Sequence, residues 1–225
     1  MSVVIAGGHG RVALMVSRLL ADRGERVLGI IRRPEQAGAV RAAGARTLVS
    51  DLATTTVEQF TQYVDGARAV LFAAGAGLGD ALGRADPVDH DAAVAIADAA
   101  ELAGVRRFVM LSAMGADPAR HYPVDPLVET FLRAKGRADE NLVARGALDT
   151  TVVRPGWFRD GPRTGGVHLA ESTGPGEIAR ADVAAVLAAL LTVSSTTPRV
   201  LELTAGTTPV AEAVARFAPP LPDTG

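Results

Sequence analysis

The sequence contains no cysteine. This absence excludes disulfide bonds, thiolate nucleophiles and metal sites built on cysteine. Any redox chemistry would therefore depend on a bound cofactor. The four histidines also lack the close spacings of metal-binding motifs, so we expect no metal site; they are His9, His90, His121 and His168.

Aromatic residues are scarce, at 4% of the chain, and the formal net charge is only −2. A core with few aromatic residues must be built from aliphatic side chains and alanine, which suits helices packed closely on a sheet. The near balance of charge gives no basic field to attract nucleic acid or an anionic membrane. We expect a small-molecule substrate as the partner, and a protein that is a monomer or a homodimer.

Long apolar runs are missing as well. Glycine and arginine interrupt the longest of them, and none is long enough to span a bilayer. The chain begins with a strand-like run, Val3–Ile5, and shows no charged leader followed by a longer apolar stretch, so no signal peptide is visible. We therefore expect a cytoplasmic location.

Short aliphatic runs alternate with segments of helical spacing along most of the chain. The apolar residues of the runs are continuous, which is typical of strands buried on both faces, whereas segments 12–20, 92–102 and 128–142 repeat at helical spacing. This rhythm predicts an α/β fold with a Rossmann-type, doubly wound parallel sheet in one domain, residues 1–217. The predicted strands are 2–6, 26–31, 46–50, 68–73, 106–111 and 149–154.

The pattern loosens after residue 155. Glycine and proline are frequent over residues 156–178, before a predicted helix at about 180–193 and a strand at 199–203. Loops of this length usually form a site or a lid, so we expect a small substrate-side extension here. Residues 218–225 contain three prolines and are predicted to form a flexible tail.

A glycine-rich turn directly follows the first predicted strand. It reads Gly7-Gly8-His9-Gly10-Arg11-Val12, and a helical pattern begins at its end. Glycine allows a sharp turn and lets a diphosphate approach the helix N-terminus, where free N–H groups and the helix dipole favour anions. Plain structural glycines would be the other explanation, but the flanking strand and helix favour a dinucleotide site.

Two arginines end the second predicted strand, about twenty residues past the turn, where a protein that prefers NAD usually carries an acid. They are Arg32 and Arg33. Guanidinium groups bind a 2′-phosphate through charge-assisted hydrogen bonds, whereas a carboxylate would repel it. The pair predicts NADP(H) as the cofactor over NAD(H), with Arg11 as a further contact. The alternative is that both are solvated charges at a helix start.

With these motifs in place, residues 2–205 resemble the atypical short-chain dehydrogenase/reductase group, the small NAD(P)H-binding proteins similar to biliverdin reductase B and to NmrA-like proteins. The resemblance rests on the glycine turn and on four further stretches. They are Ser50-Asp51-Leu52, the run 100–115, Ala134-Lys135-Gly136-Arg137-Ala138-Asp139 and Thr151-Val152-Val153-Arg154-Pro155-Gly156.

The resemblance implies roles for residues at the ends of three strands. Asp51 and Leu52 would meet the adenine. The cofactor would also be lined by Ala73, Ala74 and Gly75, and Pro155, Gly156 and Trp157 would lie beside the nicotinamide. Ordinary transitions from strand to loop would produce the same residues, so no single one decides the matter.

The resemblance also raises a question about catalysis. In short-chain reductases a tyrosine acts on the substrate oxygen, and a lysine four residues later lowers the pKa of that tyrosine. Here the pair reads Phe131 and Lys135, so the usual acid is missing, although Lys135 could still hold the nicotinamide ribose. Ser112 would orient a carbonyl or would only cap the strand end. Tyr122, or His121 beside it, could replace the lost acid from a loop.

Two functions remain open. The first is an oxidoreductase that passes hydride from NADPH to a small conjugated acceptor, such as a flavin or a quinone, which needs little acid catalysis because its charge is delocalised. The second is a non-catalytic NADP-binding redox sensor or regulatory protein of the NmrA-like type, which the missing tyrosine favours. The length of segment 156–178 favours the enzyme.

Overall fold

The predicted aliphatic runs form the centre of a sheet. The computed structural model describes residues 2–75, 85–119, 121, 125–193 and 198–218. The predicted bounds of the first two strands are confirmed, and those of the others differ by one or two residues. The parallel strands are β1 (Ser2–Ala6), β2 (Arg26–Ile31), β3 (Arg46–Val49), β4 (Ala67–Phe72), β5 (Arg107–Leu111), β6 (Asp149–Pro155) and β10 (Arg199–Ala205).

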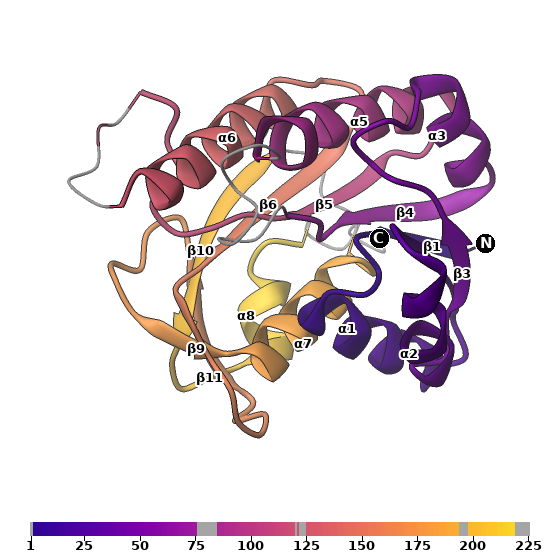
Figure 1. Ribbon diagram of the computed structural model, residues 1–225. Coiled ribbons are helices and arrows are strands. Elements are labelled where there is room, and N and C mark those ends of the chain that lie inside the picture. Colours follow the sequence, from indigo (N-terminus) through magenta and orange to yellow (C-terminus); the bar gives the residue numbers. More distant parts are fainter. Residues whose placement is uncertain (1, 76–84, 120, 122–124, 194–197, 219–225) are drawn as a thin grey trace, which may run out of the picture.

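These strands lie in the order β3-β2-β1-β4-β5-β6-β10 (Figure 1). Ile5 of β1 lies opposite Gly29 of β2 on one side and Leu71 of β4 on the other. The order reverses between β1 and β4, which is the switch point where ligands bind in doubly wound sheets. The predicted fold class is therefore confirmed.

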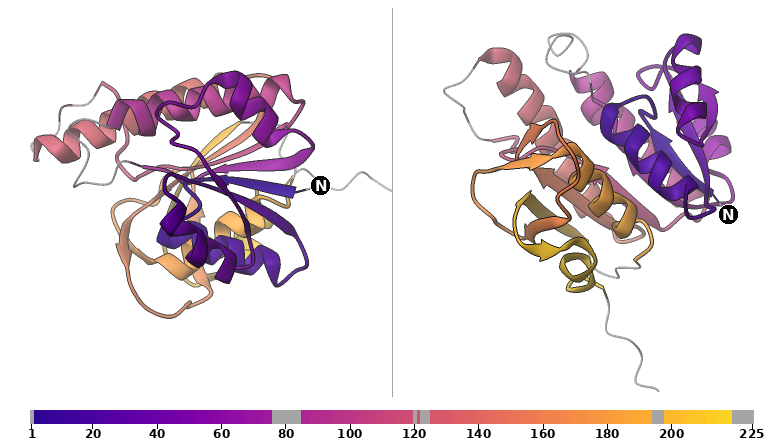
Figure 2. Two further views of the ribbon diagram at one scale, coloured as in Figure 1. Left: turned by 45° about the vertical axis from the view of Figure 1, so that its right-hand side comes forward. Right: turned by 90° about the horizontal axis from the view of Figure 1, so that it is seen from below.

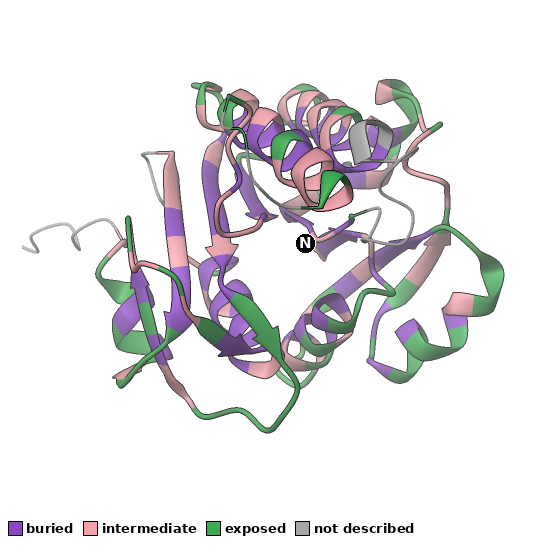
Figure 3. Cartoon of the chain, turned by 60° about the vertical axis from the view of Figure 1, so that its left-hand side comes forward, coloured by how far each residue is buried: buried purple, intermediate pink, exposed green. Residues whose placement is uncertain are grey.

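Helices cover both faces of the sheet, and their buried residues face the strands (Figure 3). No helix of the described residues is long and apolar enough to cross a membrane. One face carries α1 (Arg11–Ala21), α2 (Ala37–Ala42), α7 (Arg180–Leu190) and α8 (Val210–Ala215), and the other carries α3 (Val57–Val64), α5 (Ala92–Leu102) and α6 (Pro126–Val143). A 3-10 turn, η1 (Pro34–Gln36), and a π-helical segment, η2 (Ala85–Asp91), complete the described helical elements.

Alternate residues of each central strand enter opposite cores. Val3 and Ile5 of β1 pack in the core under α1 and α7, whereas Val4 packs in the core under α3 and α5. Both sets are almost completely buried, because helices cover the strands from both sides. This explains why the sequence shows continuous apolar runs instead of the alternation of a half-exposed sheet.

Residues 156–178 differ from the predicted irregular loop, because three strands lie within the segment. β7 (Trp157–Arg159) pairs with β9 (Glu177–Ala179), whereas β8 (Gly166–Ala170) joins the main sheet, antiparallel to β10 and to β11 (Thr208–Pro209). Figure 2 shows these segments, in orange, packed beside α7 and β10. The sequence alone did not reveal β8, because its pairing depends on residues about thirty positions later in the chain.

Two carboxylates on core elements fix this extension. Asp182 of α7, which is 1% exposed, accepts hydrogen bonds from the backbone N–H and hydroxyl of Thr164 and from the N–H of Gly165. Glu202 of β10 accepts from the N–H of Thr173 at 2.7 Å. The extension is thus anchored at two of its turns by side chains from the sheet and its covering helix.

Candidate functional site

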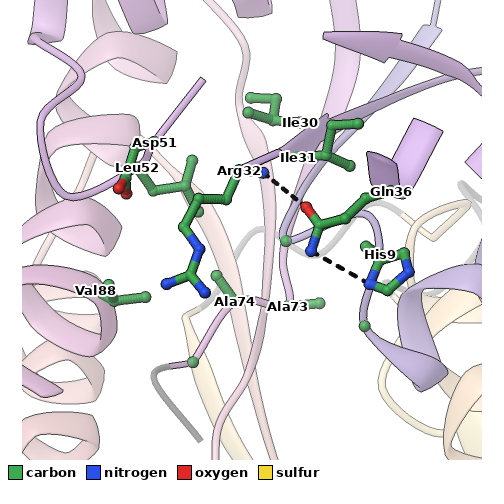
Figure 4. Close-up of a pocket in the computed structure, with 13 residues that line it drawn as sticks. His9, Ile30, Ile31, Arg32, Gln36, Asp51, Leu52, Ala73, Ala74 and Val88 are labelled. Atoms are coloured by element: carbon green, nitrogen blue, oxygen red, sulfur yellow. Dashed lines mark hydrogen bonds between the residues drawn. The ribbon is translucent and has the colours of Figure 1, made fainter. Parts of the chain in front are cut away.

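A cavity opens at the carboxyl ends of the parallel strands, beside the switch point between β1 and β4. Figure 4 shows the thirteen residues that line it. They come from the glycine turn, the ends of β2 and β4, the residues after β3, and the short helical elements η1 and η2. They are Gly7, His9, Gly10, Ile30, Ile31, Arg32, Gln36, Asp51, Leu52, Ala73, Ala74, Gly75 and Val88.

The glycines of the turn allow three segments of backbone to meet. Gly7 has a φ of 79°, and a Cβ atom there would lie 2.6 Å from the Cα of Ala74. A Cβ atom on Gly8 would lie 2.8 Å from the Cα of Gly29 in β2. Any larger residue would push the turn away from β2 and β4, so the close approach at the cavity floor requires glycine.

The N-terminus of α1 fits a diphosphate. Its N-cap is Gly10, no described side chain caps it, and its first turn holds no acidic residue. Thr56 and Asp125 cap α3 and α6 with side-chain oxygens. The helices α5, α7 and α8 share the lack of a side-chain cap with α1 but do not begin at the cavity, and α2, which also lacks one, directly continues η1. The first N–H groups of α1 are therefore left for another acceptor, and the helix dipole favours an anionic one.

The structure separates the two arginines that follow β2. Arg32 lines the cavity, and Figure 4 shows its guanidinium group extending between Val88 and Ala74. Arg33 is exposed and does not line the cavity. Contact with a 2′-phosphate therefore stays a prediction for both residues, with Arg32 the better placed.

Gln36 is a site residue that the sequence analysis missed. Its side-chain oxygen accepts hydrogen bonds from the backbone N–H groups of Arg32 and Arg33, each at 3.0 Å, and its Nε2 lies 3.4 Å from the Nδ1 of His9. Gln36 thus joins the glycine turn to the end of β2. A glutamine three residues after Arg33, the N-cap of η1, with proline at the first position of the turn, was the available signal.

Asp51 and Leu52 lie on the cavity wall opposite the glycine turn, in the loop after β3. The side chain of Asp51 accepts a hydrogen bond from the N–H of Ala53 at 3.1 Å, and its carbonyl accepts from the N–H groups of Thr54 and Thr55. These bonds shape the wall of the cavity. The contact of this wall with adenine stays a prediction.

Lys135 lies inside the protein, 3% exposed, and its ammonium group already has partners. The Nζ atom donates to the carbonyl oxygens of Ala74 at 3.0 Å and Leu111 at 3.2 Å, and it pairs with Asp89 of η2, also at 3.0 Å. Asp89 is completely buried and was not predicted as a site residue. Contact between Lys135 and a ribose stays a prediction.

Ser112 follows β5 at the same edge of the sheet and belongs to a second buried group. Its hydroxyl donates to Asp139 Oδ2 at 2.8 Å, and Nε of Arg154 donates to the same oxygen at 2.8 Å. Burial raises the pKa of Asp139, and the nearby charge of Arg154 opposes that rise. The sequence analysis missed the role of Asp139, although it follows Lys135 by one helical turn.

Three of the remaining predicted residues, Pro155, Gly156 and Trp157, lie at the start of the extension. Pro155 and Gly156 are buried, and a Cβ atom on Gly156 would collide with the carbonyl oxygen of Gly176. Trp157 is 73% exposed and does not line the cavity. Tyr122 lies outside the described residues. His121 is exposed and pairs with Glu129 at 2.9 Å.

A bridge joins the extension to the start of α1. The guanidinium group of Arg11 lies 3.1 Å from Asp160, which follows β7, and Arg180 at the start of α7 lies 2.6 Å from the same carboxylate. Arg11 does not line the cavity in this arrangement. Within the described residues, no cluster of histidine, aspartate and glutamate could hold a metal ion.

The fold and this cavity define a Rossmann-type protein with a dinucleotide site. The sequence model of the NAD(P)H-binding family matches residues 7–193, and the chain belongs to this family. It is similar over 218 residues to YhfK of Bacillus subtilis, named as an uncharacterized sugar epimerase, with 33% identity across 96% of this chain and 100% of the relative.

Solved structures agree with this assignment. An NAD-dependent epimerase/dehydratase structure from Bacillus halodurans is 30% identical, with a TM-score of 0.86 over 96% of this chain and 99% of that one. ChuY of Escherichia coli O157:H7, an anaerobilin reductase, has a TM-score of 0.76 over 91% of this chain and 97% of its own, at 21% identity, which shows a shared fold. The predicted NAD(P)H-binding family is therefore confirmed, and the family is oxidoreductase-like.

Proposed function

We propose that this protein is an oxidoreductase that uses NADPH to reduce a small conjugated acceptor, such as a quinone or a flavin. One observation carries the proposal: a single cavity joins the uncapped start of α1, the guanidinium group of Arg32 and the wall at Asp51 and Leu52. These features fit a diphosphate, a 2′-phosphate and an adenosine in turn. The bound cofactor would supply hydride.

The preference for NADPH rests on Arg32. No carboxylate takes the position at the end of β2 that would accept the hydroxyls of an NAD ribose, whereas Arg32 presents a planar set of donors to the cavity. Gln36 holds the backbone of both arginines in place. A 2′-phosphate would therefore contact the guanidinium group of Arg32, whose backbone Gln36 already holds in place.

Thermal unfolding with each cofactor tests the preference. NADPH at a hundred times its dissociation constant should stabilise the fold by about 2.7 kcal/mol. Replacing Arg32 with alanine should weaken NADPH binding about 10- to 100-fold and leave NADH binding nearly unchanged, because a charge-assisted contact contributes about 1.5–3 kcal/mol. Arg33→Ala is the matched control, with a smaller loss. A larger shift with NADH for the natural protein would overturn the assignment.

Turnover is then tested with a panel of quinones, flavins and aldehydes. The loss of NADPH absorbance measures the reduction of each acceptor. Tight NADPH binding without reduction of any acceptor would favour the second candidate, a non-catalytic NADP-binding sensor. Phe131 at the position of the usual tyrosine is the observation that favours that candidate. The same residue argues against sugar epimerisation, the activity in the name of the B. subtilis relative, because phenylalanine cannot take a proton from a sugar hydroxyl.

A further inference from the structure

The proton for the acceptor has no source at the usual place, because Phe131 replaces the tyrosine. A buried carboxyl group lies at the same edge of the sheet. Asp139, on α6, is 1% exposed and accepts the hydrogen bond of Ser112, the residue after β5. The preceding residue, Leu111, shares the ammonium group of Lys135 with Ala74, which lines the cavity. The inference below rests on the proposed function and extends it to the proton.

The two oxygens of Asp139 have different surroundings. Oδ2 accepts from the Ser112 hydroxyl and from Nε of Arg154, both at 2.8 Å. Oδ1 is buried, and no described residue donates a hydrogen bond to it. A buried carboxylate oxygen without a donor is costly, whereas the carbonyl oxygen of a neutral carboxyl group tolerates such a place better. The geometry therefore favours a proton on Asp139.

The charges that face Asp139 come from two elements. Arg154 on β6 is the nearest cation, at 2.8 Å, and its side chain is 22% exposed. Lys135 on α6 is the second, but Asp89 of η2 lies 3.0 Å from its ammonium group and offsets much of its field. Burial outweighs both cations and raises the pKa of Asp139.

We propose that Asp139 holds a proton and delivers it through the Ser112 hydroxyl to the oxygen of a carbonyl or quinone acceptor. When Asp139 is ionised, Ser112 must donate its hydrogen to the carboxylate. When Asp139 is protonated, its own hydroxyl donates to Ser112, and the serine hydrogen is free to point into the site. Asp139 acts through Ser112 and is a positioning residue, and Ser112 is the catalytic residue that touches the acceptor.

The step balances in atoms and electrons. A bound reduced cofactor would supply hydride to the acceptor carbon, and the carbonyl electron pair would move onto the oxygen. That oxygen forms a bond to the Ser112 hydrogen as the serine O–H bond breaks, and Asp139 passes its proton to the serine oxygen. Asp139 is left ionised beside Arg154, and water returns a proton to it before the next turnover.

Infrared spectroscopy tests, without any turnover, whether Asp139 holds a proton. A protonated carboxyl group has its own carbonyl stretch, and the folded protein should keep one such band above the pH at which an ordinary aspartate ionises. Asp139→Asn should lose the band. Asp149→Asn should keep it, because this carboxylate is partly exposed, pairs with Arg106 and lies at the far end of β6. Absence of the band from the natural protein, or its persistence in Asp139→Asn, would overturn the proposal.

The pH profile of single-turnover reduction tests whether the proton of Asp139 reaches the acceptor. The rate with a carbonyl or quinone acceptor should fall at alkaline pH with the same midpoint as the infrared band. Asp139→Asn should lower the rate roughly 100-fold, with NADPH affinity unchanged, and should remove that limb of the profile. If Asp139→Asn does not fold, Ser112→Ala serves instead, because it should keep a shifted band and lose the rate.

The outcomes separate this proposal from the one it rests on. A protein that reduces acceptors equally fast with and without Asp139 refutes proton delivery and leaves the oxidoreductase in place. A protein that binds NADPH and shows the band but reduces nothing refutes the oxidoreductase and the delivery step together. Matched midpoints for the band and the rate support both.

Discussion

Gly8 and Gly29 let the glycine turn approach β2 more closely at the cavity floor than any other pair of residue types would allow. The space beside Gly8 is filled by backbone, which cannot move aside as a flexible side chain can. The identity of this residue therefore controls both the packing of the turn and the path open to a diphosphate.

Replacing Gly8 with alanine should destabilise the protein by about 1–3 kcal/mol, because the new Cβ would lie 2.8 Å from the Cα of Gly29. Dinucleotide binding should weaken as well, since the turn must move. Gly38→Ala is the matched control, because this glycine lies in α2 with open space around it. The replacement should raise the free energy of unfolding by up to about 1 kcal/mol. Urea unfolding and cofactor titration measure both effects, and equal stability for the two variants would contradict this account.

The residues of the cavity divide into those that the sequence could predict and those that it could not. The glycine turn, Arg32 and Asp51 follow strands in order, so the carboxyl-edge rule places them together. Gln36 had a local signal, the proline and glutamine of η1, but its approach to His9 depends on the fold. Asp89 and Asp139, outside the cavity lining, act through side-chain contacts with residues that are distant in the chain. Such contacts leave no local pattern, so only the structure reveals them.

The extension, residues 156–178, is held in place by side chains from the neighbouring elements α7 and β10. Asp182 lies at the start of α7 and binds the turn at Thr164 and Gly165, whereas Glu202 lies on β10 and binds the turn at Thr173. A segment fixed in this way does not move freely as one lid. Motion would require the loss of several hydrogen bonds at once.

Asp182→Ala should release the turn between β7 and β8. Four hydrogen bonds end on this buried carboxylate, so we expect the loss of about 2–3 kcal/mol of stability and much faster tryptic cleavage after Arg163. Asp65→Ala, at an exposed carboxylate, is the control for a lost charge. Cleavage at the natural rate in Asp182→Ala would mean that other contacts fix the turn.

The elements themselves were predictable to different degrees. The central strands and α5 were predicted because apolar runs and helical spacing are local signals, and the bounds of β1, β2 and α5 are those of the structure. β8 was not predicted, because glycine surrounds it and its partner β10 is distant in the chain. Tertiary pairing decided its conformation, and local propensity did not.

The charge state of Asp139 should affect the stability of the whole molecule. Burial raises the pKa of this carboxyl above its ordinary value of 3.8, so the folded protein keeps a proton that the unfolded chain releases. The stabilisation is complete below that value and is lost as the pH rises through the folded pKa. Ordinary salt-bridged carboxylates show the opposite pH dependence, because their contribution to stability is lost as the pH falls.

The difference in unfolding free energy between the natural protein and Asp139→Asn should therefore shrink as the pH rises above 3.8, the ordinary pKa of the carboxyl group. Urea unfolding at a series of pH values measures this difference. Asp149→Asn gives the background, because a carboxylate is lost there without such burial. A difference that stays constant, or that grows with pH, would show that Asp139 is ionised throughout.

The place of β10 in the sheet affects the order in which the chain can fold during its synthesis. β10 lies between β6 and β8, so β8 has nowhere to dock until residues 199–205 have left the ribosome. The extension therefore assembles last, after the half of the sheet that carries the glycine turn can already be folded. A nascent chain would form the cavity of the glycine turn before the extension is in place.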